Sequence, residues 1–333
     1  MSNVKKRIAY VDIAKILGMF FIIYGHTLRN GEVTTWIYTF HVPLFFFLSG
    51  VTFHGEVLDI KTFLKKKAMA LLVPFFIWAL ISIGVFAVMS SFIPMQSTLQ
   101  SSQTNPLISM LMGYCGANSP LWFLPCLFIV EILMWIVTKL SSKMGRSVYL
   151  VSIACSSLLC LTWPLFAEKG VIWNVNNAIY LFPFSMVGYL CGNRAEKIDV
   201  TAKNIGTSAI LVAGGGTVGT VLNHQISYLG GYYGNVALFY ISAFATILGV
   251  CYFCRCLPNI LHSTYLGANT MAVLVMHKFL VMFFLVCPGI KTYTVYTHPL
   301  FCAALSIINM GLCYLAGWVV GHNKMLSKIL FGK

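Results

Sequence analysis

The sequence predicts an all-α, polytopic integral membrane protein with about ten transmembrane helices and both termini in the cytoplasm. Three observations lead to this fold class: 59% of the 333 residues are hydrophobic, only 9% are charged, and the mean hydropathy is +0.83. Soluble globular proteins carry about 25% charged residues, so this chain lacks the polar surface that water requires. The composition therefore argues against most soluble enzymes, disordered proteins and secreted disulfide scaffolds, and it predicts the lipid bilayer as the surroundings.

Ten apolar segments have the length of about 20 residues that a membrane-crossing helix needs. They cover approximately residues 10–28, 36–53, 68–92, 121–138, 148–166, 175–192, 205–222, 236–254, 270–287 and 299–320. The first is predicted to be retained as a helix and not cleaved as a signal peptide, because Asp12 and Lys15 interrupt it. No segment is large and polar enough for a soluble domain, so residues 1–333 are expected to form one membrane domain with no appended soluble domain.

The formal net charge of +14 is explained by topology, which removes the need for a nucleic-acid partner. Lys and Arg accumulate in short cytoplasmic loops. Seventeen of the 22 Lys and Arg residues fall in alternate segments that become cytoplasmic when the N-terminus is placed inside. The uncharged outer segment 93–120 is expected to form a partly ordered loop over an outward-facing cavity.

Polar side chains form a stripe along the first predicted helix. Asp12, Lys15, Met19, Ile22 and His26 recur at spacings of three and four, so they share one face, and Lys15 and His26 are separated by a rise of about 16 Å. Ionisable groups at membrane depth are functional candidates. The alternative is an amphipathic helix with a snorkelling Lys and a His at the headgroup boundary.

His26 is the candidate general base, since an imidazole can take and return a proton near neutral pH. Asp12 lies about 21 Å away along the helix, so a second contact must come from Glu131, His41 or His277. His41 is predicted at the same outer depth as His26, although it could equally be an interfacial residue. Glu131 and His277 lie inside predicted spans, where each needs a buried partner.

The second predicted helix carries small and rigid residues beside His41. Pro43 is placed near the helix start, where the loss of its backbone donor is tolerated. Ser49 and Gly50 offer a small surface on which another helix can lie. Trp122, at the start of the fourth predicted helix, could stack on a sugar ring or belong to an interfacial aromatic belt.

Two further patterns are not read as sites. The residues from Gly214 to Gly219 match G-x-G-x-x-G, but no strand precedes them, so close helix packing through Gly215 and Gly219 is predicted. A cysteine cluster with a histidine nearby lacks a second paired motif, and no metal is predicted. The residues of that cluster are Cys251, Cys254, Cys256 and His262.

Several motifs, in order along the chain, resemble the membrane-bound acyltransferase family 3, within it the fucose 4-O-acetylase-like proteins. They are Arg7-Ile8-Ala9-Tyr10-Val11-Asp12-Ile13-Ala14-Lys15 leading to Gly25-His26, Phe40-His41-Val42-Pro43-Leu44-Phe45-Phe46-Phe47-Leu48-Ser49-Gly50, Pro120-Leu121-Trp122-Phe123-Leu124 with Glu131, Phe184 to Gly188 with Tyr189, and Leu266-Gly267-Ala268-Asn269-Thr270 with His277. The first two are fairly specific and the others individually weak. The resemblance implies a ten-helix core that transfers an acyl group, usually acetyl, from cytoplasmic acyl-CoA to a sugar hydroxyl at the outer face.

The resemblance also implies roles for individual residues. The family's basic residue and histidine, eleven positions apart, are matched by Lys15 and His26, although Arg is common at the first position and Lys15 lacks its planar fork. His26 is expected to act as base or acyl carrier. The expected catalytic residues are His26, Lys15, Asp12 and Glu131, the substrate-binding residues His41, Trp122, His277, Asn269 and Ser49, and the donor-binding residues Lys15, Lys65, Lys66 and Lys67.

The expected function is therefore O-acetylation of an extracytoplasmic or lipid-linked glycan, with acetyl-CoA as co-substrate, in the inner membrane of a bacterium. A transporter of a small solute is the main alternative, but the halves of the chain show no matching broken helices. A non-catalytic membrane sensor is the third interpretation. The acceptor glycan, the acyl chain, the choice between acyl-enzyme and direct transfer, and a homo-oligomeric state are left open by the sequence.

Overall fold

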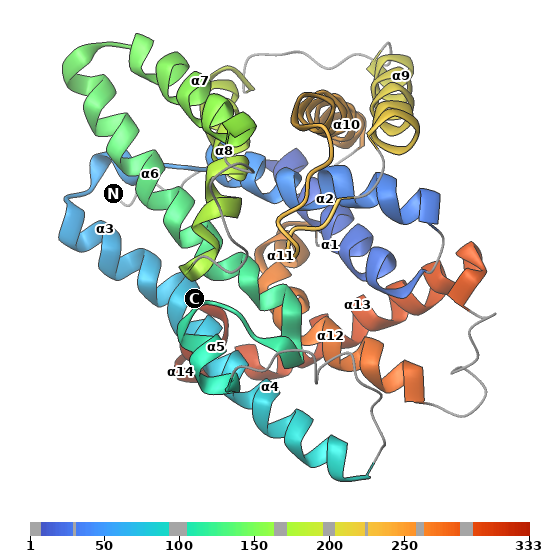
Figure 1. Cartoon of the computed structure of the whole chain (residues 1–333). Helices are drawn as coiled ribbons and strands as arrows, with labels where there is room; N and C mark the ends of the chain where they lie inside the picture. The colour runs from blue at the N-terminus through green and yellow to red at the C-terminus, as the bar shows by residue number, and fades with distance from the viewer. Residues whose placement is uncertain are drawn as a thin grey trace.

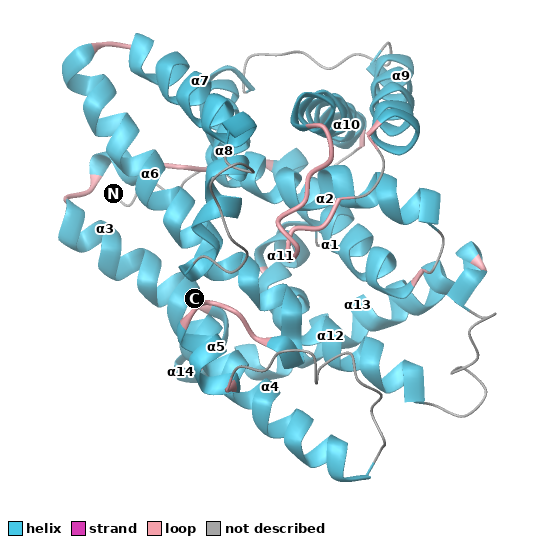
Figure 2. Ribbon diagram, in the orientation of Figure 1, coloured by secondary structure: helices cyan, strands magenta, loops and turns pink. Residues whose placement is uncertain are grey.

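The computed structural model describes residues 8–28, 31–92, 105–162, 172–195, 204–223, 226–257, 263–286 and 296–333 (Figures 1 and 2). In these residues the chain is helical and has no strand beyond an isolated bridge between Ser227 and Tyr232. This confirms the all-α fold class. In chain order the helices, with π turns at η2 and η6 and 3₁₀ turns at the other η elements, are α1 (Ala9–Thr27), α2 (Gly31–Val51), η1 (Gly55–Val57), α3 (Ile60–Lys67), η2 (Ala68–Leu72), α4 (Val73–Phe92), α5 (Pro106–Leu111), η3 (Gly116–Trp122), α6 (Phe123–Met144), α7 (Ser147–Thr162), η5 (Ile172–Asn174), α8 (Val175–Ala195), α9 (Asn204–Thr217), η6 (Val218–Leu222), α10 (Val236–Cys256), α11 (Ser263–Ala268), α12 (Thr270–Val286), α13 (Pro299–Gly321) and α14 (Lys324–Phe331).

Every predicted membrane segment coincides with a helix where the structure describes it. Six helical stretches in the described residues are long and apolar enough to cross a membrane: Ala9–Thr27, Ile60–Ser90, Pro106–Met144, Ile205–Leu222, Val236–Cys256 and Pro299–Gly321. Two more apolar helices, Ser147–Thr162 and Thr270–Phe284, are shorter. The exact number of crossings, about ten, stays a prediction.

Helix α2 packs against α8 through glycine contacts in which the two backbones nearly touch. A Cβ added to Gly50 would collide with the Ser185 carbonyl, and one added to Gly188 would collide with the Phe47 carbonyl. The Ser185 hydroxyl also donates to the Phe46 carbonyl across this contact, at 2.9 Å. Small residues permit such close approach between membrane helices, which fixes α2 in the bundle.

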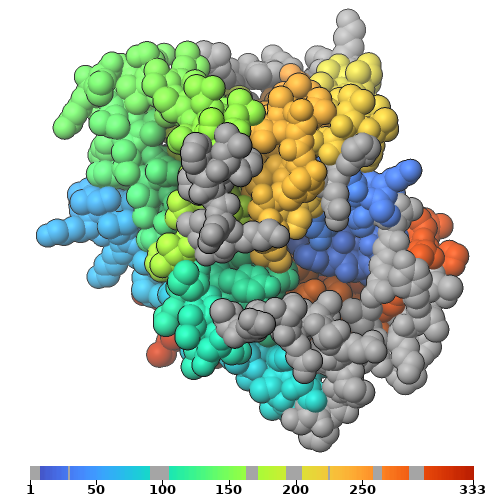
Figure 3. Space-filling view, in the orientation of Figure 1, coloured from blue at the N-terminus to red at the C-terminus, as the bar shows by residue number. Residues whose placement is uncertain are grey.

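The predicted close packing at Gly215 and Gly219 is confirmed. Helices α9 and α10 lie side by side, and a Cβ on Gly215 would strike Thr246 and the Ser242 backbone. The Ser242 hydroxyl donates to the Gly215 carbonyl at 2.7 Å. In the space-filling view α9 and α10 form one side of the upper part of the molecule, in yellow and orange, while α6 to α8 form the other, in green (Figure 3). The glycine pattern is thus a helix contact, without the strand that a dinucleotide site requires.

The basic segment between the second and third predicted membrane spans is helical. Its helix α3 begins after Asp59, whose side chain accepts a hydrogen bond from the Thr62 backbone N–H at 3.0 Å. Helix α3 continues through the π turn at Ala68–Leu72 into α4. The three lysines 65–67 therefore project from a helix, with the backbone groups of its first turn capped.

Helix α2 begins earlier than predicted, and this changes the position of Pro43. The helix starts at Gly31, where the Thr35 hydroxyl donates to the Gly31 carbonyl at 2.6 Å. Polar residues at this end lower the hydropathy and hide the first turns from a search for apolar runs. Pro43 consequently lies inside the helix and not near its start, and His41 lies ten residues in, not at an outer helix start.

The ends of the described chain lie at the same end of the bundle. Tyr10 packs under the Arg255 guanidinium, 4.4 Å from ring centroid to Cζ, and the Lys333 ammonium donates to the Asn269 side chain. This agrees with the predicted alternation of loops, while the side of the membrane that this end faces stays a prediction. Parts of that prediction lie outside the described residues: Lys5, Lys6, Arg7, Arg29, Lys169, Lys197, Lys203, Lys291 and the outer stretch 93–104.

Candidate active site

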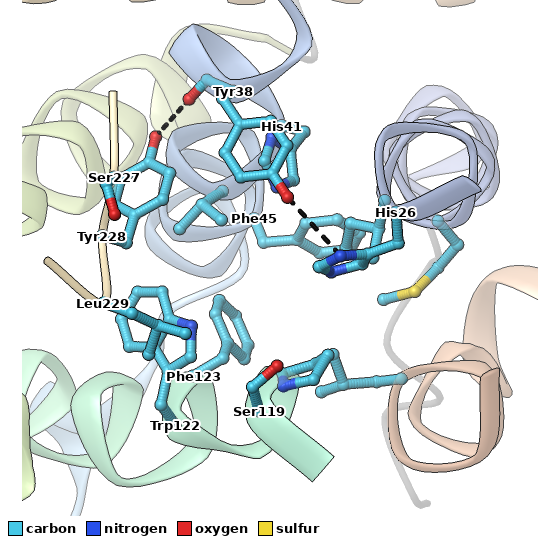
Figure 4. A pocket seen from close by; sticks show the side chains of 15 residues that line it. His26, Tyr38, His41, Phe45, Ser119, Trp122, Phe123, Ser227, Tyr228 and Leu229 are labelled. Atoms are coloured by element: carbon cyan, nitrogen blue, oxygen red, sulfur yellow. Dashed lines mark hydrogen bonds between the residues drawn. The ribbon is translucent and has the colours of Figure 1, made fainter. Parts of the chain in front are cut away.

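A cavity of about 210 Å³ lies at the opposite end of the bundle, where α1 finishes. We call it the histidine cavity. It is enclosed by α1, α2, η3, the start of α6, the loop before α10 and one residue of α12 (Figure 4). Its lining residues are Met19, Ile22, His26, Tyr38, His41, Val42, Phe45, Ser119, Pro120, Trp122, Phe123, Ser227, Tyr228, Leu229 and Leu274.

The outer part of the predicted stripe on α1 faces this cavity. Met19, Ile22 and His26 all line it, as their spacing of three and four predicts. Lys15 is half-buried further along α1 and does not line the cavity. Asp12 is buried at the other end of the helix, against Gly267. The stripe therefore joins two separate environments instead of one site.

Among the described residues, Tyr38 and His277 contact the His26 ring from other helices. The Tyr38 hydroxyl on α2 lies 3.4 Å from His26 Nδ1 (Figure 4). The His277 ring on α12 stacks on the His26 ring, with centroids 5.6 Å apart and an interplanar angle of 27°. Of the second contacts proposed from the sequence, His277 is the one that the structure places against His26.

Backbone carbonyls fix the tautomers of the other two histidines. His41 Nδ1 donates to the Ile37 carbonyl at 2.7 Å, and His277 Nδ1 donates to the carbonyls of Val273 and Leu274 at 2.9 Å each. A carbonyl only accepts, so in both rings Nδ1 carries a proton. In the neutral imidazole Nε2 is then left as an acceptor. His41 thus offers a lone pair from a ring that lines the cavity.

An aromatic wall faces the histidines. The rings of Trp122 and Tyr228 stack with centroids 5.7 Å apart and an interplanar angle of 23°. The Tyr228 hydroxyl donates to the Tyr38 carbonyl at 2.7 Å, and the Asn177 amide donates to the Tyr228 carbonyl at 3.0 Å. These bonds hold the loop before α10 over the cavity, beside Ser119 from the η3 turn.

The sequence analysis did not identify Tyr38, Tyr228 or Ser119 as residues of this site. Tyr38 could have been found, because it precedes His41 by three residues and so shares its helix face. Tyr228 and Ser119 come from connecting segments, and nothing in their spacing brings them to the histidines. Part of the predicted outer loop does cover the cavity, since Ser119 and Pro120 line it.

Glu131 is placed away from the histidine cavity. Its carboxylate forms an ion pair with the Lys67 ammonium, 2.8 Å from oxygen to nitrogen, beside the π turn. The Lys67 ammonium also lies 5.9 Å from the ring centroids of Phe53 and Phe63. The buried Glu131 therefore has a charged partner, the half-buried Lys67, and that partner is not His26.

The remaining predicted residues also lie outside the cavity lining. Lys65 and Lys66 are exposed on α3. The Ser49 hydroxyl donates to the Phe46 carbonyl at 2.8 Å, in the contact between α2 and α8. The Asn269 amide donates to the Tyr265 carbonyl at 2.7 Å, beside the chain end at Lys333. Their roles in binding stay predictions.

The cavity lining is mostly apolar, and the polar groups in it are uncharged. Its lining has imidazole, hydroxyl and indole groups but no carboxylate, ammonium or guanidinium. Such a site suits proton transfer to and from neutral groups, because an imidazole can take a proton and return it. Aromatic faces and single hydrogen-bonding groups are also what an uncharged polar ligand requires.

Comparison with known proteins places the chain in a family. The family model described as "Acyltransferase domain", Acyl_transf_3, matches residues 8–319. The nodulation protein NolL of Mesorhizobium japonicum is 27% identical in an alignment of 215 residues, and the match covers 54% of this chain and 54% of the relative, so this chain spans about half the length of that relative. No solved structure matches the chain. Because the family model covers nearly the whole sequence, the chain belongs to the acyltransferase 3 family.

Proposed function

We propose that this protein is a membrane-embedded O-acetyltransferase. It moves an acetyl group from cytoplasmic acetyl-CoA to a sugar hydroxyl of an extracytoplasmic or lipid-linked glycan of the bacterial cell envelope. The observation that carries the proposal is the position of His26, which lines an uncharged cavity between Tyr38 and His277 in an acyltransferase family member. Six helical stretches of the described residues are long and apolar enough to cross a membrane, which supports a multi-pass membrane protein.

Acetyl transfer requires a proton to be taken from the acceptor hydroxyl and a proton to be given to the thiolate of CoA. A bond forms between the acceptor hydroxyl oxygen and the acetyl carbon, the thioester C–S bond breaks, and the hydroxyl proton ends on the thiol of CoA. His26 takes that proton and returns it to the thiolate, or carries the acetyl group transiently on a ring nitrogen. His277, stacked on His26, and Tyr38 hold the ring in place.

The acceptor sugar is assigned to the rest of the cavity. His41 Nε2 accepts a hydrogen bond from a second hydroxyl, because its Nδ1 proton is engaged by the Ile37 carbonyl. The stacked rings of Trp122 and Tyr228 provide an apolar face for the sugar ring. A neutral sugar suits a cavity that lacks charged groups.

The acyl-CoA donor is assigned to the end of the bundle where α1 begins. Lys65 and Lys66 are exposed there, and with Lys15 they attract the phosphates of acyl-CoA. Lys67 contributes less than the sequence indicates, because Glu131 already neutralises it. Asp12 and Asn269 support the α11 segment at this end, where Asp12 packs against Gly267.

Transfer of label in inverted membrane vesicles tests the proposal. With the cytoplasmic face outward, labelled acetyl-CoA is added and acetylated glycan is measured in the lumen. We expect transfer by the wild-type chain and none above background by His26→Ala at equal protein abundance. The matched control is His322→Ala, because His322 is exposed and bonded to the Trp318 carbonyl outside the cavity.

Equal transfer by His26→Ala and the wild type would remove His26 as the catalytic residue. Uptake of unmodified sugar without any need for CoA would refute acetyl transfer altogether and support a transporter.

A further inference from the structure

A second and larger cavity, of about 690 Å³, lies at the end of the bundle opposite the histidine cavity. We call it the arginine cavity. Residues at the starts of α1 and α7 and toward the ends of α8 and α10 line it, with one residue from α2. Its polar lining consists mainly of Arg146, Arg255, Tyr10, Tyr149, Tyr189 and Tyr252. Its volume is within the range of small-ligand sites.

Arg255 is held in the wall of this cavity with donor capacity to spare. Its guanidinium lies over the Tyr10 ring, with Cζ 4.4 Å from the ring centroid. Its Nε is buried and has no hydrogen-bond partner among the described residues. A buried donor without a partner is costly, which is a reason to expect an acceptor at this position when the site is filled.

Arg146 adds a second guanidinium at an exposed position of the same cavity. In the described part of the chain neither arginine forms an ion pair, and none of the residues that line the cavity is acidic. Two guanidinium groups with tyrosine hydroxyls form a donor set suited to the oxygens of a phosphate.

The rest of the wall is apolar. Phe47, Val187 and Leu248 line it with other aliphatic side chains, so a hydrocarbon or other extended chain attached to the phosphate can lie along it. The cavity therefore combines donors for an anion with apolar walls. That combination matches an amphiphilic ligand and not a free inorganic ion.

We infer that the arginine cavity binds a ligand that carries a phosphate and a long chain, through Arg146 and Arg255. Two sources share this chemistry: the nucleotide phosphates of an acyl-CoA, and the headgroup of an anionic membrane lipid. The first source rests on the proposed function, whereas the second does not.

Binding measurements on the purified full-length chain in neutral detergent test the inference. The probes are CoA and short-chain phosphatidylglycerol, each titrated by calorimetry against the wild type, Arg146→Gln and Arg255→Gln. We expect the arginine variants to bind at least one probe about tenfold more weakly, the effect of losing one charged hydrogen bond. The matched control is Lys143→Gln, which removes an exposed charge three residues from Arg146 but outside the lining.

Each outcome of the titrations either identifies the ligand or overturns the inference. Weaker binding of CoA alone assigns the site to the donor, weaker binding of the lipid alone assigns it to the membrane, and weaker binding of both supports their shared phosphate. The inference is overturned if Arg146→Gln binds both probes as tightly as the wild type, if Lys143→Gln loses as much affinity as the arginine variants, or if the wild type binds neither probe. Arg146 is exposed, so its variant keeps the test valid if Arg255→Gln fails to fold.

The proposed acetyltransferase function and the arginine-cavity inference can be refuted independently of each other. If vesicles carry no acetyl transfer but the arginine variants still weaken probe binding, the site stands and the acetyltransferase proposal falls. If His26→Ala blocks transfer while both arginine variants bind CoA and lipid normally, the reverse holds.

Discussion

At the end of the bundle where α1 finishes, three histidines are held by backbone carbonyls, a tyrosine hydroxyl and each other, and the cavity that His26 and His41 line has no charged side chain. At the end where α1 begins, the polar groups include full charges: two arginines that line a larger cavity beside tyrosines, exposed lysines and a partly buried ion pair. One end is suited to moving protons and the other to holding anions. Recognition of a charged donor and chemistry on a neutral acceptor therefore do not compete for the same groups.

The largest expected effect is on the proton-transfer end. His26→Ala should lower the rate of acetyl transfer by about 10²- to 10⁴-fold, which is the usual contribution of a general acid or base. The thermal unfolding midpoint should change little, because His26 is only partly buried. Initial rates in the vesicle assay check this, and a loss matched by a large fall in the midpoint would mean that the variant reports folding and not catalysis.

The ion pair between Lys67 and Glu131, at the end where α1 begins, should contribute to the free energy of unfolding. Glu131→Gln leaves the Lys67 ammonium without its carboxylate and should cost about 2–4 kcal/mol, below the upper range for buried pairs because Lys67 is 25% exposed. Unfolding in mixed detergent micelles measures it. The double variant Lys67→Leu with Glu131→Leu should recover most of the loss, and a double variant as unstable as Glu131→Gln would contradict the pair as the cause.

A smaller effect is expected from the hydroxyl beside His26. Tyr38→Phe removes a group 3.4 Å from Nδ1, a long hydrogen bond whose loss should slow transfer about fivefold. Tyr232→Phe is the control, since Tyr232 is exposed and outside the cavity. An unchanged rate in Tyr38→Phe would show that His277 alone positions the ring.

The smallest effect concerns the cap of α3 at the charged end. Hydrogen bonds from the Thr62 side chain and backbone lower the pKa of Asp59 below its usual value of 3.8. The carboxylate thus stabilises the fold above pH 3.8, and this contribution is lost as the pH falls through the lower pKa of the folded state. Unfolding midpoints of the wild type and Asp59→Asn should therefore differ slightly at pH 6 and converge as the pH falls below the lowered pKa of Asp59, whereas a difference that is constant with pH would exclude the carboxylate charge as its cause.

The helices and one face of α1 follow from the sequence, because apolar length and a 3.6-residue period are local properties. They place Met19, Ile22 and His26 on one side before any partner is known. The start of α2 is not predictable in this way, since Gly31 to Thr35 are polar and fall outside any apolar window. Hydropathy therefore misplaces Pro43 and His41 along that helix.

Contacts between helices are what the sequence could not supply. Glu131 needs a buried partner by any physical argument, but only the fold shows that Lys67 meets it and that His277 meets His26. The stacking of Trp122 on Tyr228 joins residues more than 100 positions apart, and no spacing rule connects them. The sequence identified His41, His277 and Trp122 as candidates beside His26 but left their pairing open, and it missed Tyr38, Tyr228 and Ser119.

Helix α1 reaches both cavities, with Tyr10 in one and His26 in the other, sixteen residues or about 24 Å apart. This helix therefore fixes both the distance between Tyr10 and His26 and the angle between their side chains about the helix axis. One residue inserted after Gly18 would turn His26 by about 100° relative to Tyr10 and point it away from Tyr38 and His277. Changes in the length of this helix should be tolerated only near whole numbers of turns, so related chains should keep this interval even where loop lengths differ.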